Sequence, residues 1–382
     1  MAENTEAYKA RHKAISYFVD RKGYAEKYSL EEGIDPVDHY LEHGSTGKFD
    51  PSEFFSSSYY LERYPDVARA GINPLLHYVR FGTEEERSVI SPSSLQGKCL
   101  NFDASAPELN SHKWEPPCVI YDDQLSQDKA EMLDIMVSLN DSPASAVIVN
   151  RKSDDWLIVF SGRTENFFLV RKMLSFWGNI LFIRDKVEKY YCANSRLPAV
   201  DRLGAYIEFL TGPRSGKTIL IGQSYGGYTS LYQSIHIGGA LTFAFSPQVF
   251  HPKKYPHGMY FEKGIRKVMP EDIAPDLLDC LKKADDAPRY VIAGMSESSH
   301  DSTYYWGDAI GAGLAAGTGK AVGIIVNRNE HSTIKYLDAA KFFGVVKDNF
   351  EVLMSSMHEG ANILADSQVY YQVGTDPKDD QM

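Results

Sequence analysis

The feature that most constrains this chain is a glycine-flanked serine between an apolar run and an amphipathic one. Residues 218–221 (Thr-Ile-Leu-Ile) form a β-branched and apolar run that stops at Gly222. Ser224 and Gly226 follow, and residues 228–235 then have a helical pattern. The segment therefore predicts a strand, a tight turn and a helix, with the motif G-x-S-x-G at the turn.

A turn of this kind holds its serine in a strained conformation and projects the hydroxyl from the end of a sheet. Gly222 and Gly226 are expected because the strand and the helix pass too close there for side chains. The helix N-terminus behind Ser224 favours a developing negative charge. Ser224 is therefore the predicted nucleophile, and the alternative is a glycine-rich corner whose serine only caps the helix.

A serine hydroxyl needs a general base, and the base needs an acid that orients it. Apolar runs at 290–293 and 321–326 are each followed by a polar loop. The later loop holds His331, the predicted base, and the earlier one holds Asp301, the predicted acid. Both loops are expected at the edge where the carboxyl ends of parallel strands meet. Two other carboxylates of the same segment stay open as the acid: Glu297 and Asp308. A surface role remains the alternative for the histidine.

Stabilising an oxyanion takes two backbone N–H groups. One is expected from Tyr225, directly after the serine, and the other from Arg163, in the loop after the apolar run 156–160. The Arg163 guanidinium is also placed to bind an acidic group of a substrate, with a surface ion pair as the equally weighted alternative.

Three aromatic residues are predicted to line the substrate entrance, although core packing explains them as well: Tyr255, Tyr304 and Trp306. The first falls in an insertion near 250–288, where a cap is expected, and the other two lie beside Asp301. Aromatic faces suit sugars or aryl esters.

Short, nearly all-apolar runs alternate with helix-like ones from residue 144 onward. This pattern predicts an α/β fold with a mostly parallel sheet that helices cover on both faces. The expected strands are 145–149, 156–160, 179–183, 218–221, 240–245, 290–293 and 321–326. The expected helices include 199–210 and 334–343. The first two strands are interpreted as neighbours, joined by a hairpin turn at 152–155.

The first ninety residues contain a degenerate repeat, with copies at 24–44 and 60–82. Each copy predicts a pair of short helices, because a residue that can cap a helix stands before a proline and a glycine follows nine residues later. The capping residues are Asp35 and Asn73, and the glycines are Gly44 and Gly82. His39 and His77 occupy equivalent places and are predicted to be packing residues rather than metal ligands or catalytic groups.

These patterns divide the chain into a helical repeat domain (1–90), a linker or wrapping segment (91–143), a catalytic α/β domain (144–371) and a flexible tail (372–382). The net charge of −11 argues against nucleic-acid and anionic-membrane partners. Neither a signal peptide nor a membrane span is expected, so the predicted location is cytoplasmic. The four cysteines are scattered, and no cofactor or metal is predicted. Residues 212–218 look like a phosphate-binding loop but precede a strand, so they are interpreted as a turn.

Two resemblances add to this picture. Residues 24–82 resemble a helical repeat found beside glycosyltransferases and other enzymes of bacterial surface polysaccharides. Residues 145–350 resemble the α/β-hydrolase superfamily. The segments 182–185, 222–228 and 244–248 are most similar to hydrolase-like proteins of bacterial surface-polysaccharide loci. The second resemblance implies the fold and a Ser-His-Asp triad.

The predicted function is a serine esterase that hydrolyses an acyl ester on a carbohydrate or a small molecule through an acyl-enzyme. The alternatives are an acyltransferase that acts on a sugar hydroxyl, a serine peptidase or amidase, and a non-catalytic module of polysaccharide assembly. The expected partners are the ester substrate and, through the N-terminal repeat, a second copy of the chain or a polysaccharide-synthesis protein.

Overall fold

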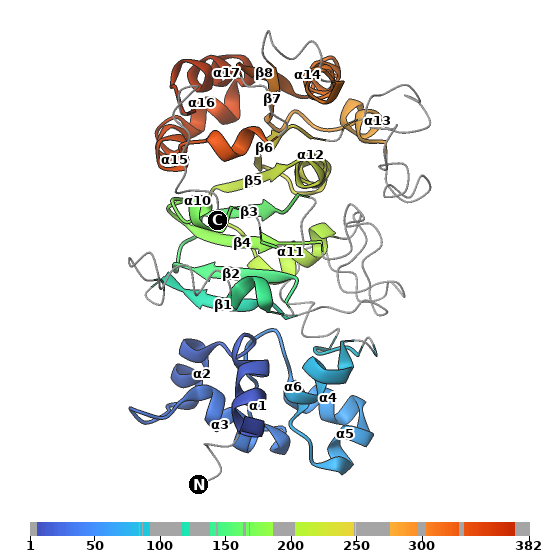
Figure 1. The fold of residues 1–382 in the computed structure, drawn as a ribbon, viewed down its shortest axis with the longest axis vertical. Coiled ribbons are helices and arrows are strands. Elements are labelled where there is room, and N and C mark those ends of the chain that lie inside the picture. Colours follow the sequence, from blue (N-terminus) through green and yellow to red (C-terminus); the bar gives the residue numbers. More distant parts are fainter. Residues whose placement is uncertain are drawn as a thin grey trace. The chain divides into compact units, whose positions relative to one another are not determined.

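The protein was analysed as a computed structural model (Figure 1). It describes residues 6–83, 85, 87–91, 116–122, 125, 138–142, 144–162, 166–167, 169–185, 203–247, 249, 276–295, 303–327 and 332–370, with the backbone alone at 295 and 303–307. The chain divides into two compact units. The first is Met1–Arg151 with Ser195–Pro198 and Ala205–Pro213, and the second is the remainder. The predicted domain boundaries at 90, 143 and 371 stay predictions.

Short helices make up the N-terminal part of the first unit, as the repeat predicts. They are α1 (Glu6–Ser16), α2 (Arg21–Tyr28), α3 (Pro36–His43), the 3-10 helix η1 (Gly44–Thr46), α4 (Ser57–Arg63), α5 (Pro65–Ala70), α6 (Pro74–His77) and the π-helix η2 (Tyr78–Gly82). Both predicted caps are confirmed. Asp35 accepts hydrogen bonds from the amides of Val37 and Asp38, and Asn73 accepts one from Leu76.

The two histidines of the repeat make the same contact in each copy. The Tyr24 hydroxyl lies 2.8 Å from His39 Nδ1, and the Tyr60 hydroxyl lies 3.0 Å from His77 Nδ1. Burial lowers the pKa of both imidazoles. Both histidines therefore pack inside their copies, as predicted.

The glycines of the repeat have a different cause from the one expected. Gly44 ends α3 in a right-handed conformation, and a 3-10 turn continues from it. A side chain at Gly44 would overlap the ring of Tyr40 and the amide of Asn73, and one at Gly82 would overlap the Tyr60 hydroxyl. Close packing between and within the copies, rather than a positive φ, selects glycine at both places.

Eight strands of the described chain form one sheet, in the order β1-β2-β4-β3-β5-β6-β7-β8. They are β1 (Cys118–Tyr121), β2 (Ala146–Asn150), β3 (Trp156–Phe160), β4 (Asn179–Ile183), β5 (Thr218–Gln223), β6 (Leu241–Phe245), β7 (Arg289–Met295) and β8 (Val322–Asn327). From β4 to β8 every neighbouring pair is parallel. β3, β4 and β5 are buried along their whole lengths, which explains their nearly all-apolar sequences.

The predicted hairpin between the second and third strands is wrong, because β4 lies between β2 and β3. The turn residues 152–155 do reverse the chain, with Lys152 at φ 54°. The first residue of β4 binds this turn: the Asn179 amide donates to the Asp155 carbonyl, and its side chain donates to the Ser153 carbonyl. Turn chemistry thus predicted a reversal but not which strand would pair.

Helices cover both faces of the sheet of the second unit (Figure 1). One side carries α12 (Tyr225–His236), α13 (Leu277–Lys282) and α14 (Thr303–Ala316), and the other carries α15 (Ala339–Asp348), α16 (Phe350–Ser355) and α17 (Met357–Asp366). Two further helices are α10 (Val170–Met173) and α11 (Leu203–Thr211). None of the helices in the described ranges is long and apolar enough to cross a membrane.

The predicted helix at 334–343 is two helices. A 3-10 turn, η6 (Thr333–Tyr336), is followed by α15, and the two are separated at Leu337 and Asp338. Leu337 bridges to Tyr370, and the Asp338 side chain accepts a hydrogen bond from the Lys341 amide. Asp338 thus starts a new helix where the apolar spacing alone suggested one continuous element.

Candidate active site

Ser224 sits at a sharp bend between β5 and α12. Its backbone has φ 57° and ψ −113°, outside the regions that L-residues ordinarily adopt. Such a conformation costs about 1–3 kcal/mol and persists only where the surroundings impose it. The predicted strand, strained serine and helix are therefore all present.

Two glycines allow this bend. A side chain at Gly222 would overlap the Gly226 carbonyl, and a side chain at Gly226 would overlap the Phe160 carbonyl of β3. Strand, helix and neighbouring strand are thus in backbone contact. This confirms the close approach that the G-x-S-x-G motif predicts.

Ser224 stands at the N-cap position of α12, yet its side chain makes no capping hydrogen bond. Its backbone is fixed instead. The Ser224 amide donates to the Phe245 carbonyl of β6 at 2.9 Å, and the Ser224 carbonyl accepts from the Tyr228 amide at 3.0 Å. The interpretation of this serine as a simple helix cap is therefore wrong.

The loop after β3 runs directly beside this serine. A Cβ built on Gly162 would lie 4.0 Å from Ser224 Cβ and 3.0 Å from the Gln223 carbonyl oxygen. The preceding residue, Ser161, is held by its amide, which donates to the Ile183 carbonyl at 3.0 Å. Arg163, the predicted oxyanion-hole residue, lies outside the described residues, but Gly162, the residue before it, lies beside Ser224.

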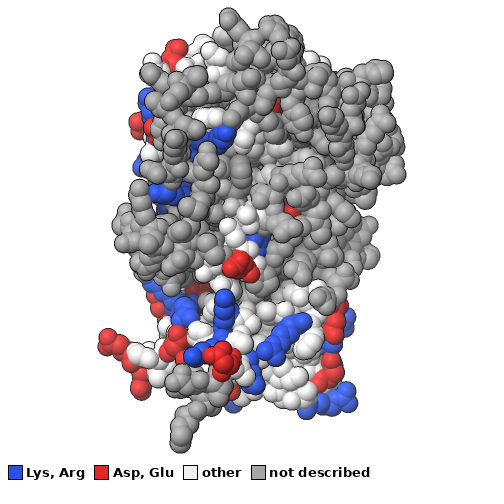
Figure 2. Space-filling view, in the orientation of Figure 1, with Lys and Arg blue, Asp and Glu red and all other residues white. Residues whose placement is uncertain are grey.

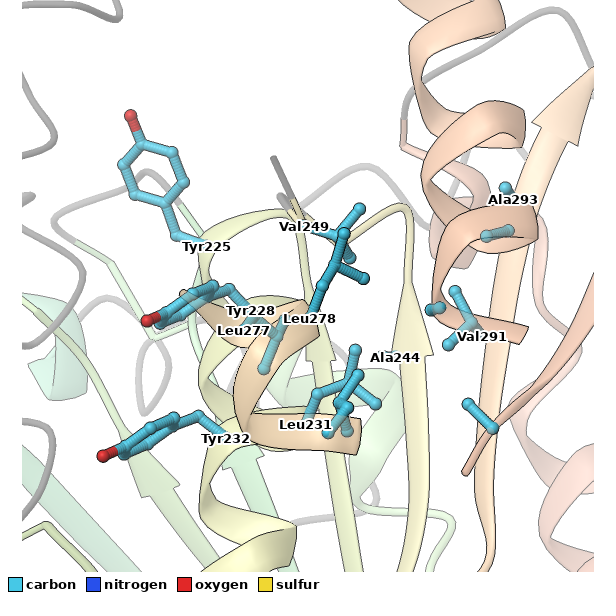
Figure 3. Packing of buried hydrophobic residues seen from close by; sticks show 14 residues of the cluster. Tyr225, Tyr228, Leu231, Tyr232, Ala244, Val249, Leu277, Leu278, Val291 and Ala293 are labelled. Carbon is cyan, nitrogen blue, oxygen red and sulfur yellow. The ribbon is translucent and has the colours of Figure 1, made fainter. Parts of the chain in front are cut away.

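Tyr225 is the first residue of α12, so its amide belongs to the first turn, whose N–H groups have no acceptor within the helix. The ring of Tyr225 leaves α12 on the same side as those of Tyr228 and Tyr232 (Figure 3). Tyr228 and Tyr232 are parallel, with ring centroids 6.3 Å apart. Leu231 points to the opposite side, toward Ala244 of β6 (Figure 3). The helix thus packs on the sheet with one face and presents a row of aromatic rings on another.

Several predicted site residues fall outside the described residues: Asp301, His331, Arg163, Tyr255 and Glu297. Tyr304 and Trp306 belong to α14, but their side chains are not described. The strands that lead to the triad loops are in place. β5, β6, β7 and β8 pair in parallel, so the carboxyl ends of β7 and β8 lie at the same edge of the sheet as Ser224.

Three charged residues are nearly fully buried where chain segments leave the carboxyl ends of the strands. Arg184 and Asp185, directly after β4, are 1% and 3% exposed, and Asp308, in the second turn of α14, is 1% exposed. The Arg184 guanidinium lies over the ring of Phe167, 4.2 Å from its centroid. Neither Arg184 nor Asp185 is among the site residues predicted from the sequence. The available signal was a charged pair that directly follows an all-apolar strand.

Among the described residues, one group has the composition of a metal site: His12, Asp35 and Asp38 of the helical unit. Its acidic groups already have protein partners. Asp35 pairs with Arg21 and caps α3, and Asp38 accepts a hydrogen bond from the Tyr8 hydroxyl at 2.8 Å. This group is therefore explained as an internal ion-pair cluster.

The strand order and the strained serine between β5 and the following helix are those of the α/β-hydrolase fold. No protein-family model matches the sequence, and no curated protein matches it. Among solved structures, the chain is similar to the capsule O-acetyltransferase of Neisseria meningitidis serogroup A, with 16% identity over 54% of this chain and 92% of that one (TM-score 0.40). It is also similar to a Pyrococcus furiosus esterase (13% identity, 55% and 85% covered, TM-score 0.38). A third similar structure is the Pyrococcus horikoshii acylaminoacyl peptidase (12%, 57% and 41%, TM-score 0.37).

Proposed function

We propose that the chain is a serine esterase, with Ser224 as the nucleophile that takes the acyl group of a carbohydrate or small-molecule ester. The observation that carries the proposal is the serine at φ 57° in a helix N-cap position that it does not use for capping. A strained residue whose side chain makes no bond to its own helix is best explained by a role for its hydroxyl in chemistry.

In the proposed mechanism, the Ser224 oxygen attacks the ester carbonyl while His331 accepts its proton and Asp301 holds the imidazole. The tetrahedral oxyanion is stabilised by the amides of Tyr225 and Arg163. His331 then gives the proton to the departing alcohol, and water that His331 activates releases the acid from the acyl-enzyme. Gly162 lies close enough to Ser224 that an added Cβ would be 4.0 Å from Ser224 Cβ, which supports the proposed use of the next amide, that of Arg163.

A fluorophosphonate probe combined with a panel of p-nitrophenyl esters of rising acyl length tests this proposal. We expect labelling of Ser224 and ester hydrolysis, with Ser224→Ala lowering kcat by about 10⁴-fold or more. A chain that is folded but unlabelled, or a Ser224→Ala variant that keeps its activity, would contradict the proposal.

The acid and the base are tested separately. His331→Ala should abolish labelling as well as turnover, because the hydroxyl then lacks its base. Asp301→Asn is compared with Asp308→Asn, and the larger loss of kcat identifies the triad acid. Analysis of the products with an added sugar acceptor shows whether the acyl group goes to water or to a hydroxyl.

A further inference from the structure

The helical unit contains a groove whose lining includes two arginines without ion-pair partners among the described residues and an exposed phenylalanine. Its volume is about 800 Å³, within the range of sites that bind small molecules. It lies between α1, the end of the first repeat copy and the end of the second. The residues that define the groove chemically are Arg11, Glu42, Ser45, Ile72, Arg80 and Phe81.

The two arginines are the charged groups of this lining that have no partner. Arg11 and Arg80 are exposed, and the described part of the chain offers neither of them a hydrogen bond or an ion pair. Other arginines of the helical unit are paired, such as Arg21 with Asp35 and Arg87 with Asp66. Two guanidinium groups on one groove therefore provide donors for a carboxylate or a phosphate.

The apolar part of the groove is also exposed. Phe81 keeps 53% of its surface in contact with solvent and Ile72 keeps 38%, in a unit whose other aromatic residues are mostly buried. The equivalent of Phe81 in the first copy is His43, which lies against the ring of Phe49. The exposed ring is thus a feature of the second copy alone and not a requirement of the repeat.

The groove lining carries both signs of charge, because Glu42 stands beside Arg11 and Arg80 among its residues. Figure 2 shows that the visible face of the helical unit, in the lower part of the view, carries both signs of charge in small groups rather than one continuous field. An extended polyanion such as a nucleic acid needs a basic stripe, which this face does not offer, and the chain as a whole has a net charge of −11.

We propose that this groove binds a saccharide unit that carries a carboxylate or a phosphate. The anionic group matches the Arg11 and Arg80 guanidinium groups, the apolar face of a sugar ring matches Phe81 and Ile72, and sugar hydroxyls match the Glu42 carboxylate and the Ser45 hydroxyl. An acidic peptide supplies the charge but not a ring whose apolar face and hydroxyl groups match Phe81 and Glu42 together, and half of the twelve lining residues are polar, unlike a helix-binding groove.

Calorimetric titration of the full chain tests the proposal with defined probes. We expect a hyaluronan tetrasaccharide, or a hexose phosphate, to bind at least tenfold more tightly than uncharged cellotetraose. Comparison of the two anions shows whether the groove prefers a carboxylate or a phosphate. Arg11→Gln and Arg80→Gln should each weaken binding of the preferred anion about tenfold, and Phe81→Ala should weaken binding of both charged and uncharged sugars.

Arg63→Gln is the matched control, because Arg63 is an exposed and unpaired arginine of the same unit outside the groove. It should leave binding unchanged, and so should Ser224→Ala, which separates this proposal from the esterase. Four results would overturn the proposal: equal affinity for cellotetraose, tighter binding of hexaglutamate than of either sugar anion, the same loss in Arg63→Gln, or no heat with any sugar at millimolar concentration.

Discussion

Two serines of this chain stand at the same position of a helix and behave in opposite ways. Ser56 precedes α4 with φ −99° and accepts a hydrogen bond from the Tyr59 amide. Ser224 precedes α12 with φ 57° and caps nothing. The first stabilises its helix, whereas the second is held in place by the sheet. Residue type and position in the helix therefore do not decide whether a serine caps it, because the backbone conformation that the neighbouring strands impose decides this at Ser224.

The largest effect should come from removing each hydroxyl in turn. Ser224→Ala should abolish ester hydrolysis without a loss of helix capping, while Ser56→Ala should keep full activity and lower the free energy of unfolding by about 1 kcal/mol. Initial rates and urea unfolding measure the two outcomes. Similar changes in both variants would show that the two positions are equivalent after all.

Gly226, one of the two glycines that allow the bend at Ser224, offers a second test. Gly226→Ala should lower the free energy of unfolding by about 3 kcal/mol, because the added methyl group meets the Phe160 carbonyl. Gly313→Ala is its control. Gly313 is an exposed helical glycine with open space around it, so the same change there should raise the free energy of unfolding by about 1 kcal/mol.

A smaller difference in stability, between the glycine and alanine variants at Ser224, measures the backbone strain. Ser224→Gly should be about 1 kcal/mol more stable than Ser224→Ala, because glycine adopts a positive φ without a steric penalty. At Ser230, a buried residue inside α12, the order should reverse, since glycine is about 1 kcal/mol worse than alanine in a helix. If the alanine variant were the more stable one at both positions, Ser224 would not be strained.

The smallest expected effect is a pH dependence of the stability of the helical unit, where His77 is buried. Because burial lowers the pKa of His77 in the folded state, the unfolded chain binds a proton first as the pH falls below the ordinary value of 6.5. Stability contributed by the neutral imidazole is therefore complete above pH 6.5 and is lost as the pH falls toward the lower, folded-state pKa. Amide hydrogen exchange of the helical unit at pH 7 and pH 5 should show this loss.

His77→Gln should weaken the pH dependence of stability. The pH dependence that remains should come from His39, whose pKa burial also lowers. Tyr60→Phe, which removes the hydroxyl partner of His77, should cost about 1 kcal/mol at pH 7. A slope that survives the loss of both histidines would place the titrating group elsewhere.

The sequence predicted most structural features that depend only on residues close together in the chain. The bend at Ser224, the caps at Asp35 and Asn73, and the strand at 156–160 follow from patterns within a few residues. The strand that pairs with β2 could not be predicted in this way. Asn179, more than twenty residues after the turn, donates hydrogen bonds to two carbonyl groups of the turn, and its strand β4 lies between β2 and β3.

The candidate site likewise combines a part set by neighbouring residues with a part set by distant segments of the chain. The strained bend at Ser224 is encoded in one contiguous motif and was predicted, whereas the burial of Arg184 and its contact with Phe167 depend on segments distant in the sequence. The glycines at 44 and 82 were found for the wrong reason, since a pattern that ends a helix cannot reveal that a tyrosine of the same copy lies beside each glycine, or that Asn73 of the other copy lies beside Gly44.

The first residues after β3, β5 and β6 are all serines, and each amide remains bonded to the neighbouring strand: Ser161 to Ile183, Ser224 to Phe245 and Ser246 to Ile292. The ladder of the sheet therefore extends one step past the ends of its strands. The backbone position of Ser224 therefore depends on the sheet itself and not on the segments that follow the neighbouring strands.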